Sequence, residues 1–388
     1  MKPRVSLLNN PQVRSAAFQA ALFLGLGLAA YAAFITLSDK LARKPGLIDL
    51  GFWNQLSGFD ISQSFIPFAA GVSTYGRVFF VGLLNTLAIS AIGIVLATLL
   101  GFTIGVARLS TNWLVSKLAT IYVEGLRNVP LLLQLLFWYQ AILQPLPDPK
   151  QSIALPGNIF LNNRGFIVPE PIFGPGSVWV LAALVLAIVA ALVFRNRARV
   201  RQLATGQQAP VGLVALGLII GLPVLAFFSA GLPISFSLPE LGKFNIHGGL
   251  SLFPEFVALL LGLVLYTATY IAEIVRAGIL AVSHGQTEAA GALGLQPGLT
   301  NKLIVIPQAL RVIIPPLTSQ YLNLIKNSSL AVAIGYPDLV QVYMGTVLNQ
   351  TGAAVQVVLT TMAVYLTISL LISLAMNIYN KKKSLAER

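Results

Sequence analysis

The sequence contains no cysteine, which excludes disulfides, thiolate metal sites and cysteine nucleophiles. It has only two histidines, His247 and His284, and neither lies in a metal-ligand spacing such as HExxH. There is also no GxxxxGK[ST] phosphate-binding loop, because Gly242-Lys243 lacks both the earlier glycine and a following Ser or Thr. We therefore expect no catalytic residue, no metal and no cofactor on this chain. Any ATP must be hydrolysed by another protein.

Charged residues are also scarce. They make up 10% of the 388 residues, whereas 56% are apolar. A soluble domain needs roughly 25% charged residues to cover its surface, so this is the composition of a membrane protein. The net charge of +13 does not indicate nucleic acid, because Lys and Arg cluster beside the ends of apolar runs, as topology signals do. The first apolar run is too long for a cleavable signal peptide and predicts a membrane anchor.

Eight segments are apolar enough to cross a hydrocarbon core of about 30 Å, which takes about 20 helical residues. Their approximate spans are 16–37, 78–107, 128–145, 177–194, 211–229, 253–281, 308–333 and 353–379. The predicted fold class is an all-α integral membrane protein. With the N-terminus inside, 17 Lys and Arg residues fall on the inner side and seven on the outer side. The positive-inside rule then predicts a multi-pass protein with both termini and the stretch from Gly285 in the cytoplasm.

Two parts look like additions to a central bundle. Residues 1–75 hold a tail, the first anchor and an outer loop, and residues 146–250 hold two outer loops around two spans joined by a basic turn. The central parts are residues 76–145 with two core helices and residues 251–388 with three. The cytoplasmic loop 282–306 lies between the first two of those three helices.

That loop contains a short polar, Gly/Ala-rich stretch, Gly285–Leu295, with the signals of a small helix. Ser283 and Gln286 have capping-box spacing, and Glu288 is expected in the first turn, where the helix dipole favours an acid. Gly294 is expected to end the helix. Local physics leaves two readings open, a docking helix held outside the membrane and an ordinary loop with one helical turn.

Charges inside spans cost several kcal/mol unless they are paired or face a polar cavity. Glu273 and Arg276 lie one helical turn apart near the cytoplasmic end of their span, so they form either a structural ion pair or part of a substrate or gating site. In the span 308–333, Asn323, Lys326 and Asn327 share one face, with Ser328 nearby. That face predicts either a lining of the translocation pathway or contacts between helices.

A further polar group follows the cytoplasmic turn after the second span. It consists of Tyr122, Glu124, Arg127 and Asn128. We expect these residues at the membrane surface, as anchors rather than ligands.

The phrase EAAGALG, followed by nine residues and IVIP, resembles the EAA loop of integral-membrane subunits of ABC importers. The matching residues are Glu288, Ala289, Ala290, Gly294, Ile304 and Pro307. The leucine of the family pattern I-x-L-P is replaced by Ile306. In that family the loop is a coupling helix seated in a groove of the ATPase. The resemblance therefore places the ATPase contact on Gly285, Gln286, Glu288, Ala289, Ala290 and Gly294.

Other segments resemble the polar amino acid permeases in the same order and spacing. They are NTLAISAIGIVLATLLG, YVEGLRNVPLLLQLLFWY, YTATYIAEIVRAGILAVSHGQTEAA and LIKNSSLAVAIGYPDL. The overall layout looks like the longer permeases of general L-amino acid uptake systems of Gram-negative bacteria. The resemblance implies a five-helix type I importer core with an added anchor and a two-helix insertion.

The resemblance also implies partners. These are an ATPase dimer that uses ATP and Mg²⁺, a second homologous permease in a heterodimer, and a periplasmic amino acid-binding protein. Glu273, Asn323, Lys326, Asn327 and Ser328 become neighbours of the translocation pathway, with Lys326 suited to a carboxylate and Glu273 to an ammonium. Two alternatives remain from the residues alone, an ion-coupled secondary transporter and a membrane scaffold or sensor. The substrate set and the role of the insertion stay undetermined.

Overall fold

The computed structural model describes residues 11–43, 50–242 and 245–383 of the chain. Within these residues, seven helices are long and apolar enough to cross a membrane, and a shorter apolar helix covers Leu131–Leu143. The all-α membrane fold is therefore confirmed, with the predicted span 128–145 realised as the shorter helix. The ends that carry the predicted cytoplasmic tails, residues 1–10 and 384–388, lie outside the described residues.

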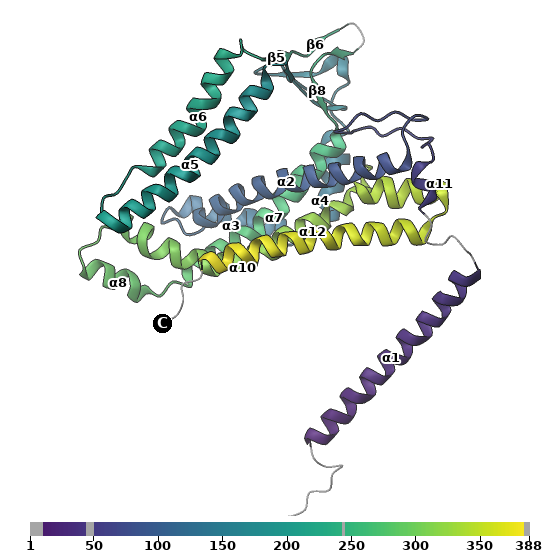
Figure 1. The fold of residues 1–388 in the computed structure, drawn as a ribbon, viewed down its shortest axis with the longest axis horizontal. Coiled ribbons are helices and arrows are strands. Elements are labelled where there is room, and N and C mark those ends of the chain that lie inside the picture. Colours follow the sequence, from purple (N-terminus) through teal and green to yellow (C-terminus); the bar gives the residue numbers. More distant parts are fainter. Residues whose placement is uncertain (1–10, 44–49, 243–244, 384–388) are drawn as a thin grey trace, which may run out of the picture. The chain divides into compact units, whose positions relative to one another are not determined.

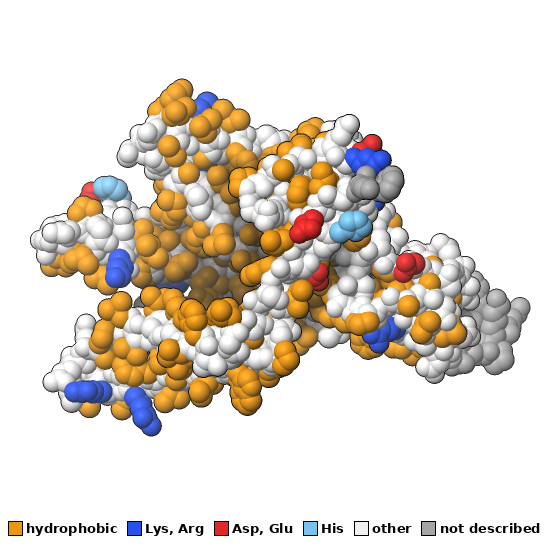
Figure 2. Space-filling view, turned by 90° about the horizontal axis from the view of Figure 1, so that it is seen from above, with side chains coloured by type: hydrophobic (Ala, Val, Ile, Leu, Met, Phe, Trp, Pro, Cys, Tyr) orange, Lys and Arg blue, Asp and Glu red, His pale blue; other side chains and the backbone are white. Residues whose placement is uncertain are grey.

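The long helices cover most of each predicted span, because each span is a long apolar run. They are α1 (Pro11–Arg43), α2 (Tyr75–Ala107), α5 (Ser177–Thr205), α6 (Val211–Ser229), α7 (Pro254–Leu280), α10 (Ile306–Asn327) and α12 (Ala354–Lys383). Helices α6 and α10 continue through internal prolines. Many of their large hydrophobic side chains are exposed, as expected for lipid-facing helices. Figure 2 shows hydrophobic side chains over much of the visible surface, with Lys and Arg only in small separate groups.

The chain divides into two compact units. The first holds residues 1–88 and 337–388, including the π-helical turn η7 (Val340–Val347) and the short helix α11 (Leu348–Thr351). Its core is aromatic: Trp53 donates a hydrogen bond of 2.9 Å to the hydroxyl of Tyr343, and Phe79 packs edge-on against the Tyr343 ring. Asp338 is fully buried here and accepts a 2.8 Å hydrogen bond from the backbone N–H of Gln341.

The second unit, residues 89–336, is organised around α7, in which 14 of the 27 residues are buried. Small residues let its neighbours approach closely. A Cβ on Gly105 of α2 would lie 2.7 Å from the carbonyl oxygen of Ala272, and one on Gly278 of α7 would lie 2.3 Å from Ile313 of α10. These glycines allow α2, α7 and α10 to pack closely near the C-terminal ends of α2 and α7.

A third partner of α7 is a broken helix. It consists of α3 (Trp113–Arg127), α4 (Leu131–Leu136) and the π-helical segment η3 (Phe137–Leu143). Asn112 caps α3 by accepting hydrogen bonds from the backbone N–H groups of Leu114 and Val115. Pro130 separates α3 from α4, and the buried side chain of Gln134 donates to the carbonyl oxygens of Leu126 and Val129. The break between α3 and α4 is therefore stabilised, because Gln134 satisfies carbonyl oxygens that the interrupted helix leaves without backbone partners.

The predicted insertion forms a hairpin and a set of short strands. Helices α5 and α6 lie side by side as an antiparallel pair (Figure 1). The first of the outer loops forms strands β1 (Ile153–Leu155), β2 (Ile159–Asn162), β3 (Gly165–Val168) and β4 (Glu170–Phe173), and the second forms β5 (Ile234–Ser237), β6 (Glu240–Leu241), β7 (Ile246–His247) and β8 (Leu250–Leu252).

The strands join the two outer loops to each other. A four-stranded antiparallel sheet has the order β1-β2-β3-β8, with Phe166 opposite Leu252, while β4 pairs with β5 and β6 with β7. Gly165 has a φ of +105°, and a Cβ there would lie 2.0 Å from the carbonyl oxygen of Leu252, so only glycine fits this register. The outer loops were expected as turns or covers; the pairing across some 80 residues was not visible in the sequence.

Candidate functional site

The predicted docking helix is present as α8 (His284–Ala292), followed by α9 (Pro297–Thr300) and the π-helical segment η5 (Asn301–Val305). Its end has the bonds of a Schellman motif. The N–H of Leu295 donates to the carbonyl oxygen of Ala290, and the N–H of Gly294 donates to that of Gly291. Gly294 adopts a φ of +75°, as predicted for the residue that ends the helix. The helical reading of the loop is therefore correct.

The expected capping at the start of α8 is wrong in its details. Ser283 occupies the N-cap position, but its side chain makes no capping hydrogen bond. Glu288 lies beyond the first turn and instead contacts His284, with 2.9 Å between Nδ1 and Oε1. Gln286 accepts a 3.2 Å hydrogen bond from the side chain of Gln308 on α10. The capping-box pattern predicted the helix but not the partners of its side chains, which the neighbouring helix decides.

The surface of α8 is available to a partner. Five of the six predicted coupling residues are exposed, and only Ala290 is buried, at 1% exposure. The sequence reading did not single out Leu293, whose side chain is 81% exposed beside the polar face that carries Glu288. Leu299 and Leu303 are also exposed in the following segment. A small surface helix flanked by exposed leucines has the make-up of a protein–protein contact.

An ion-paired cluster joins α2 and α7 near their C-terminal ends. Arg276 donates to Glu273 at 2.6 Å, which is the i,i+3 pair expected from the sequence. Arg108, which follows α2, also pairs with Glu273, and this third member was not predicted. Because both oxygens of Glu273 are bound by guanidinium groups, its charge is neutralised within the chain. Of the two roles predicted for Glu273, a structural ion pair accounts for all of its observed contacts.

The polar residues at the end of α10 separate into two kinds. Asn323 and Lys326 are exposed and Asn327 is half-buried, so these three do present one polar face. Ser328 begins η6 (Ser328–Ala333), is fully buried, and donates a 2.8 Å hydrogen bond to the carbonyl oxygen of Ile325. The hydroxyl of Ser328 is thus engaged within its own turn.

Glu273 and Lys326 are not brought together. Leu324 packs against Gly93 of α2, whereas Ala272 packs against Gly105. These two glycines are twelve residues apart, which is about 18 Å along a helix. Since a single amino acid is shorter than that, Glu273 and Lys326 do not bind its two charged groups at the same time.

Two members of the polar group on α3 contact the middle of α7. The hydroxyl of Tyr122 donates a 2.9 Å hydrogen bond to the carbonyl oxygen of Leu265, and the guanidinium of Arg127 lies 5.1 Å from the ring centre of Tyr270. Both partners are in the middle of α7 rather than at its ends. Tyr122 and Arg127 thus pack against α7 away from both of its ends, and their role as anchors at the membrane surface stays a prediction.

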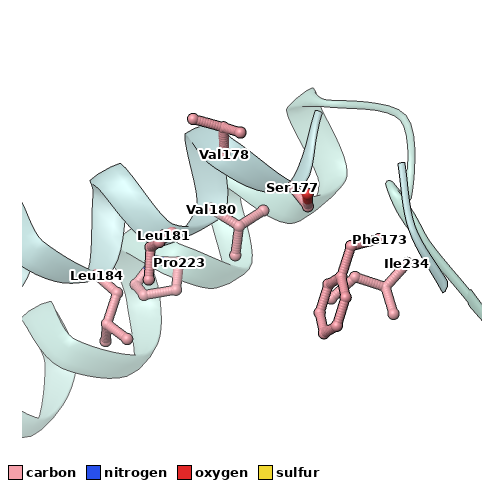
Figure 3. A pocket seen from close by; sticks show the side chains of 8 residues that line it. All are labelled: Phe173, Ser177, Val178, Val180, Leu181, Leu184, Pro223 and Ile234. Carbon is pink, nitrogen blue, oxygen red and sulfur yellow. The ribbon is translucent and has the colours of Figure 1, made fainter. Parts of the chain in front are cut away.

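A cavity of about 430 Å³ lies at the end of the α5–α6 hairpin near β4 and β5. Figure 3 shows its lining, in which Leu181, Leu184 and Pro223 come from the hairpin and Phe173 and Ile234 from the two strands. Ser177 is the one polar residue among those that line it. A charged or zwitterionic ligand would find no partner there, so this cavity is not a substrate site for such a molecule.

Comparison with known proteins places these features in a family. Residues 213–384 match the model of the binding-protein-dependent transport system inner membrane component. The general L-amino acid transport system permease protein AapQ of Rhizobium johnstonii is 50% identical over 384 residues, which cover 99% of this chain and 95% of the relative. The chain belongs to the amino acid ABC transporter permeases.

Two further relatives agree with this assignment. The putative amino-acid ABC transporter permease protein YhdX of Escherichia coli strain K12 is 50% identical over 98% of this chain and 96% of its own length. The glutamate/glutamine/aspartate/asparagine transport system permease protein BztB of Rhodobacter capsulatus is 44% identical over 86% of this chain and 84% of its own. The resemblance seen in the EAA loop is confirmed, and nothing in these relatives favours an ion-coupled transporter. The permease is a multi-pass inner-membrane protein and a transport subunit rather than an enzyme.

Proposed function

We propose that this permease carries L-amino acids into the cell and that α8 is the helix through which a separate ATPase drives it. Of the two relatives that match nearly the whole chain, one is named for general L-amino acid transport and the other for putative amino-acid transport. A third relative is named for glutamate, glutamine, aspartate and asparagine. The observation that carries the coupling role is α8 itself: a nine-residue exposed helix at the end of the central helix α7, with the EAA spacing on its surface.

The contacts of α8 give it a mechanical connection to the membrane helices. Ala290 is buried on its inner side, and Gln286 is hydrogen-bonded to Gln308 of α10. On the outer side, Glu288 offers a charge and Leu293 an apolar group to a partner. When ATP closes the ATPase dimer, α8 moves with the ATPase surface, and its attachments transmit that motion to α7 and α10. The direction of transport follows from partners that bind two conformations with different affinity.

The complete transporter in this proposal has four kinds of subunit. They are this permease, a second homologous permease, two copies of the ATPase that hold ATP and Mg²⁺, and a periplasmic binding protein. Both termini and the α8 loop face the cytoplasm, in keeping with the seventeen basic residues assigned to that side. The proposed lining of the pathway at the outer half of α10 consists of Asn323, Lys326 and Asn327. Glu273 lies near the inner end of the pathway.

The experiment that tests the coupling role is Glu288→Lys. Because the Glu288 side chain is 69% exposed, the reversal leaves folding and membrane insertion unaffected. We expect the variant to accumulate in the membrane at the wild-type level, to lose co-purification with the ATPase, and to lose amino acid uptake. The measurements are membrane yield, ATPase recovered on the tagged permease, and uptake of a radiolabelled amino acid.

A matched control is Gln202→Lys, which adds a positive charge at an exposed position of α5. It should behave as wild type in all three measurements. Wild-type uptake by the Glu288→Lys permease would show that α8 is not the coupling helix. Loss of membrane yield in both variants would point to an insertion defect instead.

A further inference from the structure

The polar side chains of α3 form one continuous line along the helix. We call it the α3 polar stripe and define it as Lys117, Thr120, Glu124 and Arg127. The intervals of three, four and three residues place all four on one face. Lys117, Glu124 and Arg127 are exposed and Thr120 is half-buried. A different face carries the exposed apolar residues Leu114, Leu118 and Ile121.

The upper end of the stripe lies inside the membrane. Arg127 contacts Tyr270, which stands ten residues before the end of α7 at Leu280 and sixteen after its start at Pro254. At 1.5 Å per residue these are about 15 Å and about 24 Å, so α7 is longer than a hydrocarbon core of about 30 Å. A core centred on α7 places Tyr270, and the guanidinium of Arg127 beside it, about 10 Å inside the nearer face of the core.

The charges of Glu124 and Arg127 are not neutralised by each other or by neighbours. Among the described residues, neither side chain has an ion-pair partner within 4.0 Å, in contrast to Glu273 with its two arginines. The guanidinium of Arg127 lies over the face of the Tyr270 ring, and the hydroxyl of Tyr270 is in turn hydrogen-bonded to that of Tyr266 at 2.9 Å. Unpaired charges at this depth are too costly to face lipid and therefore face water or a ligand.

We propose that the α3 polar stripe lines the translocation pathway and that Arg127 and Glu124 bind the α-carboxylate and the α-ammonium of the transported amino acid. The guanidinium is suited to a carboxylate because it donates two parallel hydrogen bonds. Glu124 lies one turn below, at the spacing that lets two side chains reach one small zwitterion. Gln134 and Pro130 hold the break in the helix directly after Arg127 and so fix the direction of this end of the stripe.

This assignment rests on the proposed transport of amino acids and adds a substrate feature to it. The groups bound are those that all L-amino acids share. A site of this kind therefore selects for the α-amino acid unit and leaves the side chain to be chosen elsewhere. Thr120 and Lys117 continue the stripe from Glu124 by about 10 Å towards the start of α3, which gives the released amino acid a polar route.

The first test uses the absence of cysteine from the chain. Single cysteines are placed on the two faces of α3 in the assembled transporter and treated with a charged, membrane-impermeant thiol reagent in inside-out vesicles. The stripe variants are Lys117→Cys, Thr120→Cys, Glu124→Cys and Arg127→Cys, and the apolar-face controls are Leu118→Cys and Ile121→Cys. We expect labelling of the stripe and not of the controls, with L-glutamate slowing the reaction at positions 124 and 127. Equal labelling of both faces would overturn the proposal. No labelling of the stripe would also overturn it, because the stripe would then be buried against a second permease.

The second test measures binding of radiolabelled L-glutamate and of its α-amide to the nucleotide-free transporter in detergent. Loss of a charged hydrogen-bond donor predicts that Arg127→Ala binds L-glutamate about 10- to 100-fold more weakly while binding of the α-amide is unchanged. Arg127→Lys should fall between these values, and Arg195→Ala on α5 is the matched control. An Arg127→Ala transporter that still prefers L-glutamate over its α-amide by the wild-type factor would refute the carboxylate role. Failure of the wild-type transporter to take up any amino acid would instead contradict the proposed function.

Discussion

The ion-paired cluster of Arg108, Glu273 and Arg276 makes a quantitative prediction about how α2 is held to α7. Glu273→Gln keeps the shape of the side chain and removes its charge. Arg108 then loses its only ion-pair partner among the described residues, although its side chain is just 12% exposed. Its Nε is already buried with no hydrogen-bond partner, so the guanidinium has no alternative contact to compensate.

The expected cost follows from these contacts. Breaking a fully buried ion pair by removing one partner costs about 3–5 kcal/mol. Glu273 and Arg276 are 28% and 32% exposed, so water screens part of the charge that remains and lowers the cost. We expect Glu273→Gln to lose about 2–3 kcal/mol of stability, since a charged hydrogen bond contributes about 1.5–3 kcal/mol.

The assay is thermal unfolding of the purified, assembled transporter for a double-mutant cycle. Arg108→Gln, Glu273→Gln and the double variant are compared with wild type at the same salt concentration. The double variant should be less damaged than the sum of the two single variants, with a coupling of about 1–3 kcal/mol, because the buried charge of Arg108 is then removed together with its partner. Single effects that add to within about 0.5 kcal/mol would refute the reasoning, since side chains that do not interact give additive effects.

Two further predictions concern packing and pH. Gly105→Ala should lower the yield of folded permease on size-exclusion chromatography, because its Cβ would lie 2.7 Å from the carbonyl oxygen of Ala272. Overpacking of this kind costs about 1–3 kcal/mol. The control is Gly217→Ala, whose Cβ would have no neighbour within 4 Å and whose yield should not change. Burial raises the pKa of Asp338 to about 7, above the pKa of an aspartate in the unfolded chain. The folded state therefore retains the proton, and the stability of the fold decreases as the pH rises from about 4 to about 7. Asp338→Asn should remove this slope when melting temperatures are measured between pH 5 and pH 8, and an unchanged slope would assign it to another group.

The parts of the candidate site that could be predicted are those whose interacting residues lie close together in sequence. The helix α8, the termination at Gly294 and the pair of Glu273 with Arg276 each depend on residues within about ten positions of one another. The membrane spans were predictable for the same reason, because hydropathy is a property of a continuous run of residues. The start of α8 was not read correctly in detail, since the partner of Gln286 is on another helix.

Contacts between distant segments could not be read in this way. Arg108 is 165 positions from Glu273, and the strands β3 and β8 pair across the whole α5–α6 hairpin. The depth of Arg127 also needed the tertiary structure, because the residues around it are too polar to register as a membrane span. A polar stripe is invisible to a hydropathy average, which sums over all faces of a helix.

The sequence alone determined that this chain is a helical membrane protein without its own energy source, and that it has an EAA loop for a partner ATPase to meet. Those conclusions depend on composition and on local spacing, which are present before the chain folds. Only the tertiary structure decided which charges are paired within the chain and which remain free. Pairing depends on distance between helices, so it neutralises Glu273 and leaves Glu124 and Arg127 available to a substrate.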